Sequence, residues 1–307
     1  MINFRYHVVS LTAVFFALAI GLVVGTAALN GPVADSLRGQ IDSLGQQNEE
    51  LRDRVNHLND DVEAREQFAE QVAPVVLANR LAGVRVLILF TPSGEEHVDG
   101  VRDMLTLAGA TVTGRVGVTD RFTDPASNDE LLDLAHTSLP AGVPDGLPTN
   151  SDGVEASAAL LGAVLLDRTP PVAEADRRAV LAAYTAPGYL SGTGDVTAAA
   201  GAVVFVSGPP YAGPEAPRRN AAIVTTVTQL DNVGVVTVAA GADAGEGNVV
   251  AEVRGDPRLA QTVSTVDNAG TPQGRLVVAW ALAEQIAGRA GHYGIGSGAT
   301  LLPKTAR

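Results

Sequence analysis

Hydrophobic and polar positions divide the chain into three parts. Residues 8–29 carry no charged side chain, residues 37–62 place apolar side chains at heptad spacing, and from residue 84 short apolar runs alternate with helical patterns. At 1.5 Å per residue the first part makes a helix of about 33 Å, which matches the hydrocarbon core of a bilayer. We therefore predict a transmembrane signal anchor over residues 8–29.

The flanks of this segment predict its orientation. Arg5 and His7 precede the segment, and the next basic residue is Arg38. The positive-inside rule then predicts a cytosolic tip at residues 1–7 and an extracytoplasmic remainder. Two alternatives stay open: a cleaved secretory signal, which usually has a shorter apolar core, and a buried globular helix, which usually has a polar face.

The second part has the pattern of a parallel dimeric coiled coil. We expect a linker at residues 30–36, because Gly31 and Pro32 disfavour helix, and a coiled coil over residues 37–73 that ends near Pro74. The alternative is an amphipathic helix packed on its own domain, but such helices usually have a wider apolar stripe. The predicted homodimer seam has spacings of 4 and 3 residues and consists of Leu37, Ile41, Leu44, Asn48, Leu51, Val55, Leu58 and Val62.

The composition of this seam specifies a strand number and a direction. Leucine occupies every d position, at residues 37, 44, 51 and 58, and β-branched residues occupy most a positions. This combination favours two parallel strands, and a single asparagine at an a position, Asn48, fixes the register at a cost in stability.

The third part, residues 80–292, predicts an α/β layered domain. Short apolar or alternating runs predict strands at 84–90, 111–118, 202–206, 233–239 and 263–266. Apolar positions at helical spacing predict helices at 95–108, 154–166, 172–183, 218–230 and 274–289. We expect residues 120–150 to be rich in loops and residues 293–307 to form a flexible tail.

Composition and motifs exclude several functions. The net charge of −13 disfavours nucleic-acid binding, and the absence of cysteine excludes disulfides, thiolate catalysis and cysteine-based metal sites. The chain lacks the glycine-rich nucleotide loops, the nucleophile elbow and the HExxH motif. Glu95 and Glu96 would also repel a phosphate at the start of the helix that follows the first strand. We therefore predict no catalytic residues.

Asp267 and Asn268 form the candidate ligand site. They follow the last predicted strand and precede the last helix, and open α/β sheets bind ligands at the carboxyl ends of their strands. The alternative is a helix cap, a role in which both residue types are common.

No cofactor or metal site is predicted. The five histidines are scattered, at positions 7, 57, 97, 136 and 292, and Met1 and Met104 are the only methionines. Since Cu(I) favours sulfur ligands, a copper site is poorly supplied. Such a site would have to bring His97, His136 or His292 together with carboxylates.

Several short motifs resemble one family. These motifs lie near both ends of the chain and around the last predicted strand and helix, at residues 5–11, 13–15, 17–19, 264–267, 274–275, 281–282 and 293–299. Jointly they are similar to the actinobacterial MctB/SteB family, whose order of anchor, coil and α/β domain covers the whole chain. The resemblance implies either copper transport or a role in septation, in which the protein works with a SteA-like membrane partner to control cell-wall hydrolysis.

We therefore expect a non-enzymatic, single-pass envelope protein whose dimer presents an α/β domain to a SteA-like partner or a cell-wall component in septation. Copper transport is the alternative. An extracytoplasmic enzyme that uses Asp267 is the third and weakest hypothesis, because no pair of base and nucleophile is visible in the sequence.

Overall fold

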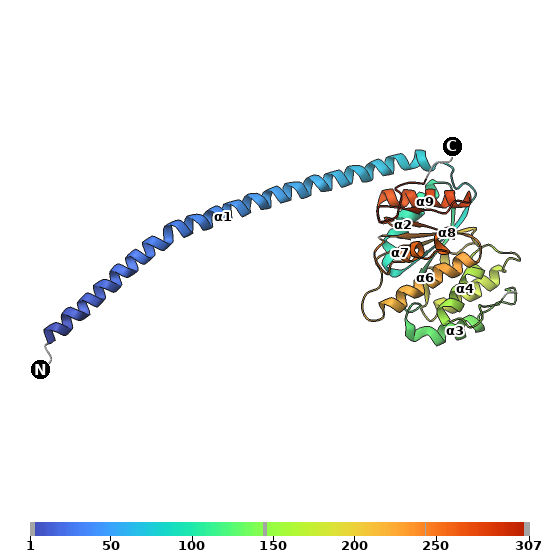
Figure 1. Ribbon diagram of the computed structural model, residues 1–307. Helices are drawn as coiled ribbons and strands as arrows, with labels where there is room; N and C mark the ends of the chain where they lie inside the picture. The colour runs from blue at the N-terminus through green and yellow to red at the C-terminus, as the bar shows by residue number, and fades with distance from the viewer. Residues whose placement is uncertain (1–3, 144–145, 243, 304–307) are drawn as a thin grey trace. The chain divides into compact units, whose positions relative to one another are not determined.

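The computed structural model describes residues 4–143, 146–242 and 244–303, and the side chains of all of these except 28–34. It divides into two units, Met1–Ala64 and Arg65–Arg307, which are described separately. The described part of the first unit belongs to helix α1, Phe4–Leu77 (Figure 1).

Helix α1 corrects one prediction. It runs without interruption through Gly31 and Pro32, where we expected a linker at residues 30–36, and it ends three residues after Pro74. A proline inside a helix removes one backbone hydrogen bond, and its ring clashes with the carbonyl of the residue four positions earlier. Both effects destabilise the helix locally. The stretches on both sides of Pro32 have helical patterns of their own, and the helix continues through both.

The second unit contains a sheet of seven strands among the residues that the structure describes, in the order β3-β2-β1-β4-β5-β6-β7. All neighbours pair in parallel except β3, which pairs antiparallel with β2. The strands are β1 (Arg85–Phe90), β2 (Thr111–Val118), β3 (Leu190–Ser191), β4 (Ala202–Ser207), β5 (Val236–Gly241), β6 (Val263–Val266) and β7 (His292–Tyr293). The central strands β1 and β4 are buried almost throughout, as parallel strands covered on both faces should be.

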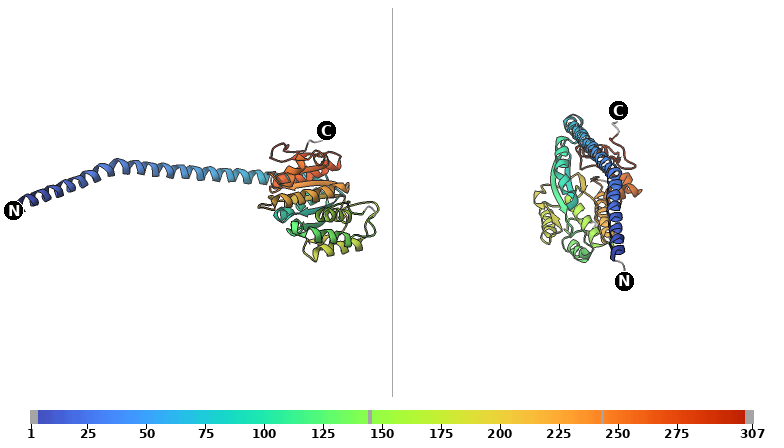
Figure 2. Two further views of the ribbon diagram at one scale, coloured as in Figure 1. Left: turned by 60° about the horizontal axis from the view of Figure 1, so that its bottom comes forward. Right: turned by 90° about the vertical axis from the view of Figure 1, so that its left-hand side faces the viewer.

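Helices cover both faces of the sheet (Figures 1 and 2). One core lies between the sheet, the last turns of α1, and helices α2 (Glu95–Leu107) and α9 (Pro272–Ile286). The other core is covered by α3 (Asn128–Thr137), α4 (Gly153–Leu165), α5 (Glu174–Thr185), α6 (Ala216–Asn232), α7 (Val249–Gly255) and α8 (Leu259–Thr262). The predicted α/β layered architecture is confirmed.

Two local predictions are wrong. Helix α3 lies in the segment 120–150, where loops were expected, because Leu131 and Ala135 give it a buried face one turn apart. Residues 293–303 do not form a free tail: Tyr293 belongs to β7 and is buried, and Gly294 N donates to Thr300 O at 2.9 Å. Residues 304–307 lie outside the described part.

Candidate functional site

The direction of the strand order reverses between β1 and β4. The chain passes from β1 through α2 to β2 on one side, whereas β4, β5 and β6 follow on the other side. In open α/β sheets this switch point is where the carboxyl ends of the strands leave a crevice for a ligand. A ligand site in this fold is therefore expected at the loops that follow β1 and β4.

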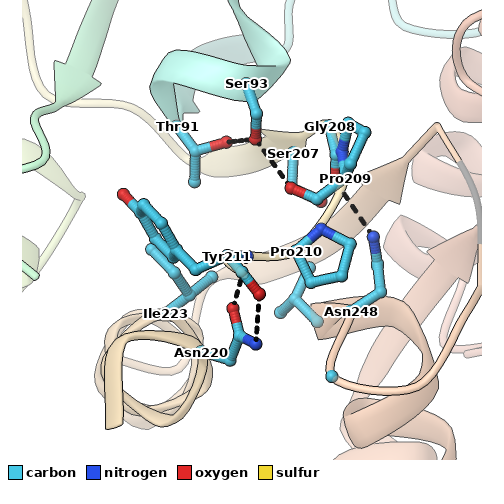
Figure 3. A pocket seen from close by; sticks show the side chains of 12 residues that line it. Thr91, Ser93, Ser207, Gly208, Pro209, Pro210, Tyr211, Asn220, Ile223 and Asn248 are labelled. Atoms are coloured by element: carbon cyan, nitrogen blue, oxygen red, sulfur yellow. Dashed lines mark hydrogen bonds between the residues drawn. The ribbon is translucent and has the colours of Figure 1, made fainter. Parts of the chain in front are cut away.

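Two glycines close this crevice by bringing the two loops into contact. A Cβ at Gly94 would lie 2.5 Å from the carbonyl oxygen of Val206, and a Cβ at Gly208 would lie 1.8 Å from that of Ser93. Ser93 Oγ also donates to Pro209 O at 3.0 Å. The remaining cavity of about 20 Å³ has room for little more than a water molecule (Figure 3).

One buried hydroxyl in this cavity has no described partner. Ser207 is 5% exposed, and its Oγ makes no hydrogen bond to the described residues. Thr91 Oγ1 and Ser93 Oγ, on the opposite wall, are 3.2 Å apart and bond to each other. The crevice thus offers one free hydroxyl and no charge, which suits neither a nucleotide nor a metal ion.

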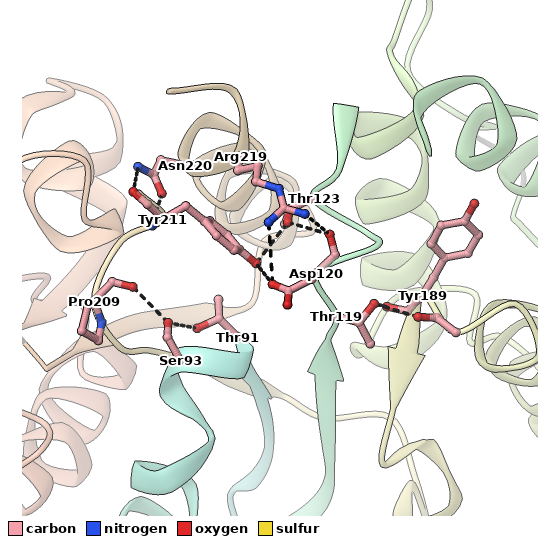
Figure 4. A network of polar contacts seen from close by, with 11 residues as sticks. Thr91, Ser93, Thr119, Asp120, Thr123, Tyr189, Pro209, Tyr211, Arg219 and Asn220 are labelled. Carbon is pink, nitrogen blue, oxygen red and sulfur yellow. Dashed lines mark hydrogen bonds and ion pairs between the residues drawn. The ribbon is translucent and has the colours of Figure 1, made fainter. Parts of the chain in front are cut away.

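Tyr211 joins the loops on the far side of the crevice (Figure 4). Its hydroxyl donates to Asp120 Oδ1 at 2.9 Å and accepts from Thr123 Oγ1 at 3.1 Å. Arg219 stacks on the ring at 4.7 Å and donates to the backbone oxygen of Asp120 at 3.0 Å. Burial, above all, raises the pKa of Tyr211, so the hydroxyl stays protonated near neutral pH and serves as a structural donor.

Open hollows lie on both sides of the closed switch point. One, of about 350 Å³, is lined at the ends of β1 and β2 by residues that include Glu95 and Asp120. The other, of about 590 Å³, lies beside α6 and α7 and includes Glu246 and Glu252. Carboxylates at both places oppose a phosphate, and Arg121, which also lines the first hollow, is already paired with Glu130 at 2.7 Å.

Asp267 occupies the position predicted for it, after β6, but its carboxylate is already satisfied. The side chain is 1% exposed and lies 2.8 Å from Arg254 Nη1. Its two oxygens also accept from the backbone N–H groups of Ile295, at 2.7 Å, and Gly296, at 3.0 Å. Asp267 therefore holds the C-terminal loop, and the cap of α9 is Thr271, whose Oγ1 accepts from Gly274 N.

Arg254 completes this cluster, which we call the C-terminal clasp: Arg254, Thr265, Asp267, Tyr293 and the N–H groups of residues 295 and 296. Besides Asp267, the guanidinium donates to Thr265 Oγ1 at 2.9 Å and to Tyr293 O at 2.8 Å. The clasp joins two of the motifs that carry the family resemblance. Sequence reasoning missed Arg254, and the one signal for the loop was its run of alternating glycines.

Comparison with known proteins identifies the family over the whole chain. The family model described as "Copper transport outer membrane protein, MctB" matches residues 1–303. The chain belongs to the MctB family. It is 33% identical over 310 residues to proteins named "Copper transporter MctB" from Mycobacterium bovis and Mycobacterium tuberculosis, covering 97% of this chain and 98% of theirs. A protein of the same name from Mycobacterium leprae is 33% identical over 316 residues, covering 98% of each chain.

The described residues of this MctB-family chain do not assemble a copper site from histidines. His97 lies on α2 and His136 on α3, and these helices pack against opposite faces of the sheet, so the two rings do not meet. His292 has both ring nitrogens engaged, Nδ1 with Thr265 Oγ1 at 2.9 Å and Nε2 with Ala260 O at 3.1 Å. No group of three or more metal-binding side chains occurs among the described residues.

The side chains of the N-terminal apolar segment and of the predicted seam are exposed on α1. Within the described part of the chain, Phe4–Ala27 is the one helical segment long and apolar enough to span a bilayer, with a mean hydropathy of 2.5. This segment suggests a membrane anchor, and a signal sequence would have the same composition. All eight predicted seam residues are exposed in the single chain, Leu37 and Val62 at 53% and 50%.

Proposed function

We propose that this chain acts in copper transport at the cell envelope, as a non-enzymatic, membrane-anchored protein whose α/β domain recognises another protein. The observation that carries the proposal is the similarity over residues 1–303 to a family described by copper transport. The described residues offer no cluster of metal ligands. In this proposal copper is the cargo of the process and not a ligand resident in this domain.

The proposed arrangement has the N-terminus in the cytosol and the α/β domain outside the membrane. The one apolar helix in the described part of each chain cannot enclose a channel by itself, so in this proposal the route for copper uses several chains or another membrane protein. In this arrangement the stripe from Leu37 to Val62 pairs with that of a second copy. Dimerisation would hold two α/β domains at the same distance from the membrane.

Septation is the second candidate, and the names of the relatives give it no support. It rests on the resemblance of the sequence to the SteB branch, which also implies a SteA-like partner. Both functions use the same anchor, coil and recognition domain. The architecture therefore does not distinguish copper transport from septation, whereas the phenotype of a deletion strain does.

A deletion strain separates them. We expect loss of the gene to change cell-associated copper and growth on copper, with septum placement unchanged, and the full-length chain to restore both copper readouts. His97→Ala combined with His136→Ala should restore them equally well, because these side chains do not meet. A septation defect with normal copper content would instead favour the SteB-like role.

Copper binding to the full-length protein in detergent tests the proposal that copper is cargo and not a ligand of this domain. We expect no tight, stoichiometric binding of Cu(I) or Cu(II) above that of a carboxylate-rich control protein. Tight binding at one equivalent per chain would contradict the proposal that copper is not a ligand of this chain. In that case, loss of the binding in the double histidine variant would identify the ligands.

A further inference from the structure

The last turns of α1 have two apolar faces, and the described chain covers one of them. Ala73 and Leu77 are buried in the core that contains α2 and α9, and Ala69, one turn before Ala73, is also buried. Phe68 and Val75 lie on another side of the same turns, where they are 68% and 81% exposed. Large apolar side chains on a helix that already packs on its domain indicate a second contact.

The exposed face has the spacing of the seam. Phe68, the half-buried Val72 and Val75 are separated by 4 and 3 residues, the same alternation that runs from Leu37 to Val62. Arg65 occupies the seam position that follows Val62. The alternation would place the next seam position four residues later, at Ala69, but the exposed apolar side chain is Phe68, three residues after Arg65. A three-residue insertion of this kind shifts the phase of a coiled coil and overwinds it locally.

We propose that a second copy of this chain covers Phe68, Val72 and Val75, so that the parallel coil continues past Arg65 to the edge of the α/β domain. The inference rests on the proposed dimer and extends its seam. The phase shift has a physical cause: the original heptad phase after Val62 reaches Ala69, which the chain's own domain buries. The partner helix must therefore move to the neighbouring face.

A second copy is the occupant that the helix itself favours. The apolar segment Phe4–Ala27 lies at the N-terminal end of α1, so two copies in one membrane start in the same direction and at the same level. Equivalent residues then face each other along the rod, Phe68 with Phe68 and Val75 with Val75. Gln71, which flanks this face, is uncharged and opposes no like charge.

Single cysteines test the extended seam, because the natural chain has none. In membranes that contain the full-length protein, Leu51→Cys, Phe68→Cys and Val75→Cys should give disulfide-linked dimers on oxidation with diamide. Glu70→Cys, on the exposed outer side of the same turns, is the matched control. We expect it to crosslink at least about tenfold more slowly, because a disulfide needs Cβ atoms about 4 Å apart.

The outcomes distinguish this inference from the dimer on which it rests. If Leu51→Cys crosslinks but Phe68→Cys and Val75→Cys react no faster than Glu70→Cys, the helices separate at Arg65 and the extended seam is wrong while the dimer stands. If Leu51→Cys fails as well, both are wrong. Val75→Asp gives a second readout: the dimer should dissociate at a concentration at least about tenfold higher, with the unfolding of the α/β domain unchanged.

Discussion

The two units of this molecule differ in whether the chain buries their large apolar side chains. In Met1–Ala64, every large apolar side chain that the structure describes is exposed, from Phe4 to Val62. In Arg65–Arg307, two continuous cores fill both faces of a sheet, and the buried charges of the C-terminal clasp are paired. The second unit thus buries most of its large apolar side chains within the chain, with Phe68 and Val75 at the end of α1 among the exceptions.

The difference teaches where partners are needed. A helix without packed neighbours gains little from propensity alone, since most helical stability in proteins comes from packing. In the proposed arrangement, lipid surrounds the apolar end of the first unit and a second helix covers its heptad stripe, whereas the α/β domain already buries its two cores within the chain. Substitutions on the heptad stripe of α1 should change assembly, and substitutions in the two cores and the C-terminal clasp should change folding.

The largest expected effect breaks assembly. Leu44→Asp combined with Leu51→Asp places two carboxylates at d positions of the proposed seam, where burying unpaired charge costs several kcal/mol per site. We expect the full-length protein in detergent to change from dimer to monomer by light scattering, with the thermal unfolding of the α/β domain unchanged. Gln46→Asp, at an outward position of the same helix, should remain dimeric. A double variant that stays dimeric would contradict the seam.

The next largest effect lowers the free energy of unfolding of the α/β domain and leaves the proposed dimer unchanged. Asp267→Ala removes the carboxylate that Arg254 and two backbone N–H groups share, which leaves a buried guanidinium partly unpaired. Loss of one partner of a buried ion pair typically costs about 3–5 kcal/mol. Urea unfolding should show this loss, whereas Glu174→Ala, which removes an exposed pair with Arg178, should stay within about 0.5 kcal/mol. An unchanged stability would mean that the clasp does not hold the loop.

The repeating parts of the fold could be predicted from the sequence. Strands β2 and β6 begin and end at the predicted residues, and β1 and α2 are within one residue, because buried parallel strands and amphipathic helices have distinct apolar periods. The break at residues 30–36 was wrong because a local proline signal competes with a long helical context. Helix α3 was missed because its buried face, with Leu131 and Ala135, is only one turn long.

The polar sites could be predicted less well. Position brought Asp267 to attention correctly, at the end of β6, but its partners lie at residues 254, 295 and 296, and no local pattern announces such long-range contacts. The same limit applies to Gly94 and Gly208, whose role is to let two distant loops touch. A single sequence indicates which side chains lie at the edge of the sheet. It does not indicate which of them form hydrogen bonds or ion pairs with one another.

A smaller effect concerns pH. Burial, and then the charge of Arg254, lower the pKa of His292. The unfolded chain, with an ordinary histidine pKa near 6.5, therefore binds more protons than the native one as the pH falls, so stability decreases below about pH 6.5. Between pH 6.5 and 5.5 one histidine contributes at most about 1 kcal/mol. The dependence should be weaker in His292→Gln, and an equal slope would assign it to another group, such as His97, whose pKa burial also lowers.

The smallest expected effect is that of Ser207→Ala, and Ser157→Ala is its comparison. Ser157 and Ser207 are both buried, but Ser157 Oγ accepts from the Tyr184 hydroxyl at 2.9 Å and donates to Leu131 O at 3.2 Å, whereas Ser207 Oγ has no described partner. Ser157→Ala should cost about 1–3 kcal/mol, because it leaves a buried tyrosine hydroxyl without its acceptor. Ser207→Ala should change the free energy of unfolding by less than about 0.5 kcal/mol, or raise it, because removing an unsatisfied hydroxyl removes a desolvation cost.

The comparison of the two serines is informative in both directions. If Ser207→Ala costs as much as Ser157→Ala, the hydroxyl is satisfied in solution by a water or ligand group in the cavity of about 20 Å³ at the switch point. The crevice would then be an occupied site, and the stability of the α/β domain would depend on the water or ligand group held there. If Ser207→Ala is neutral, the closed loops at Gly94 and Gly208 are the finished state of this edge. Recognition by the domain would then have to use its outer surface.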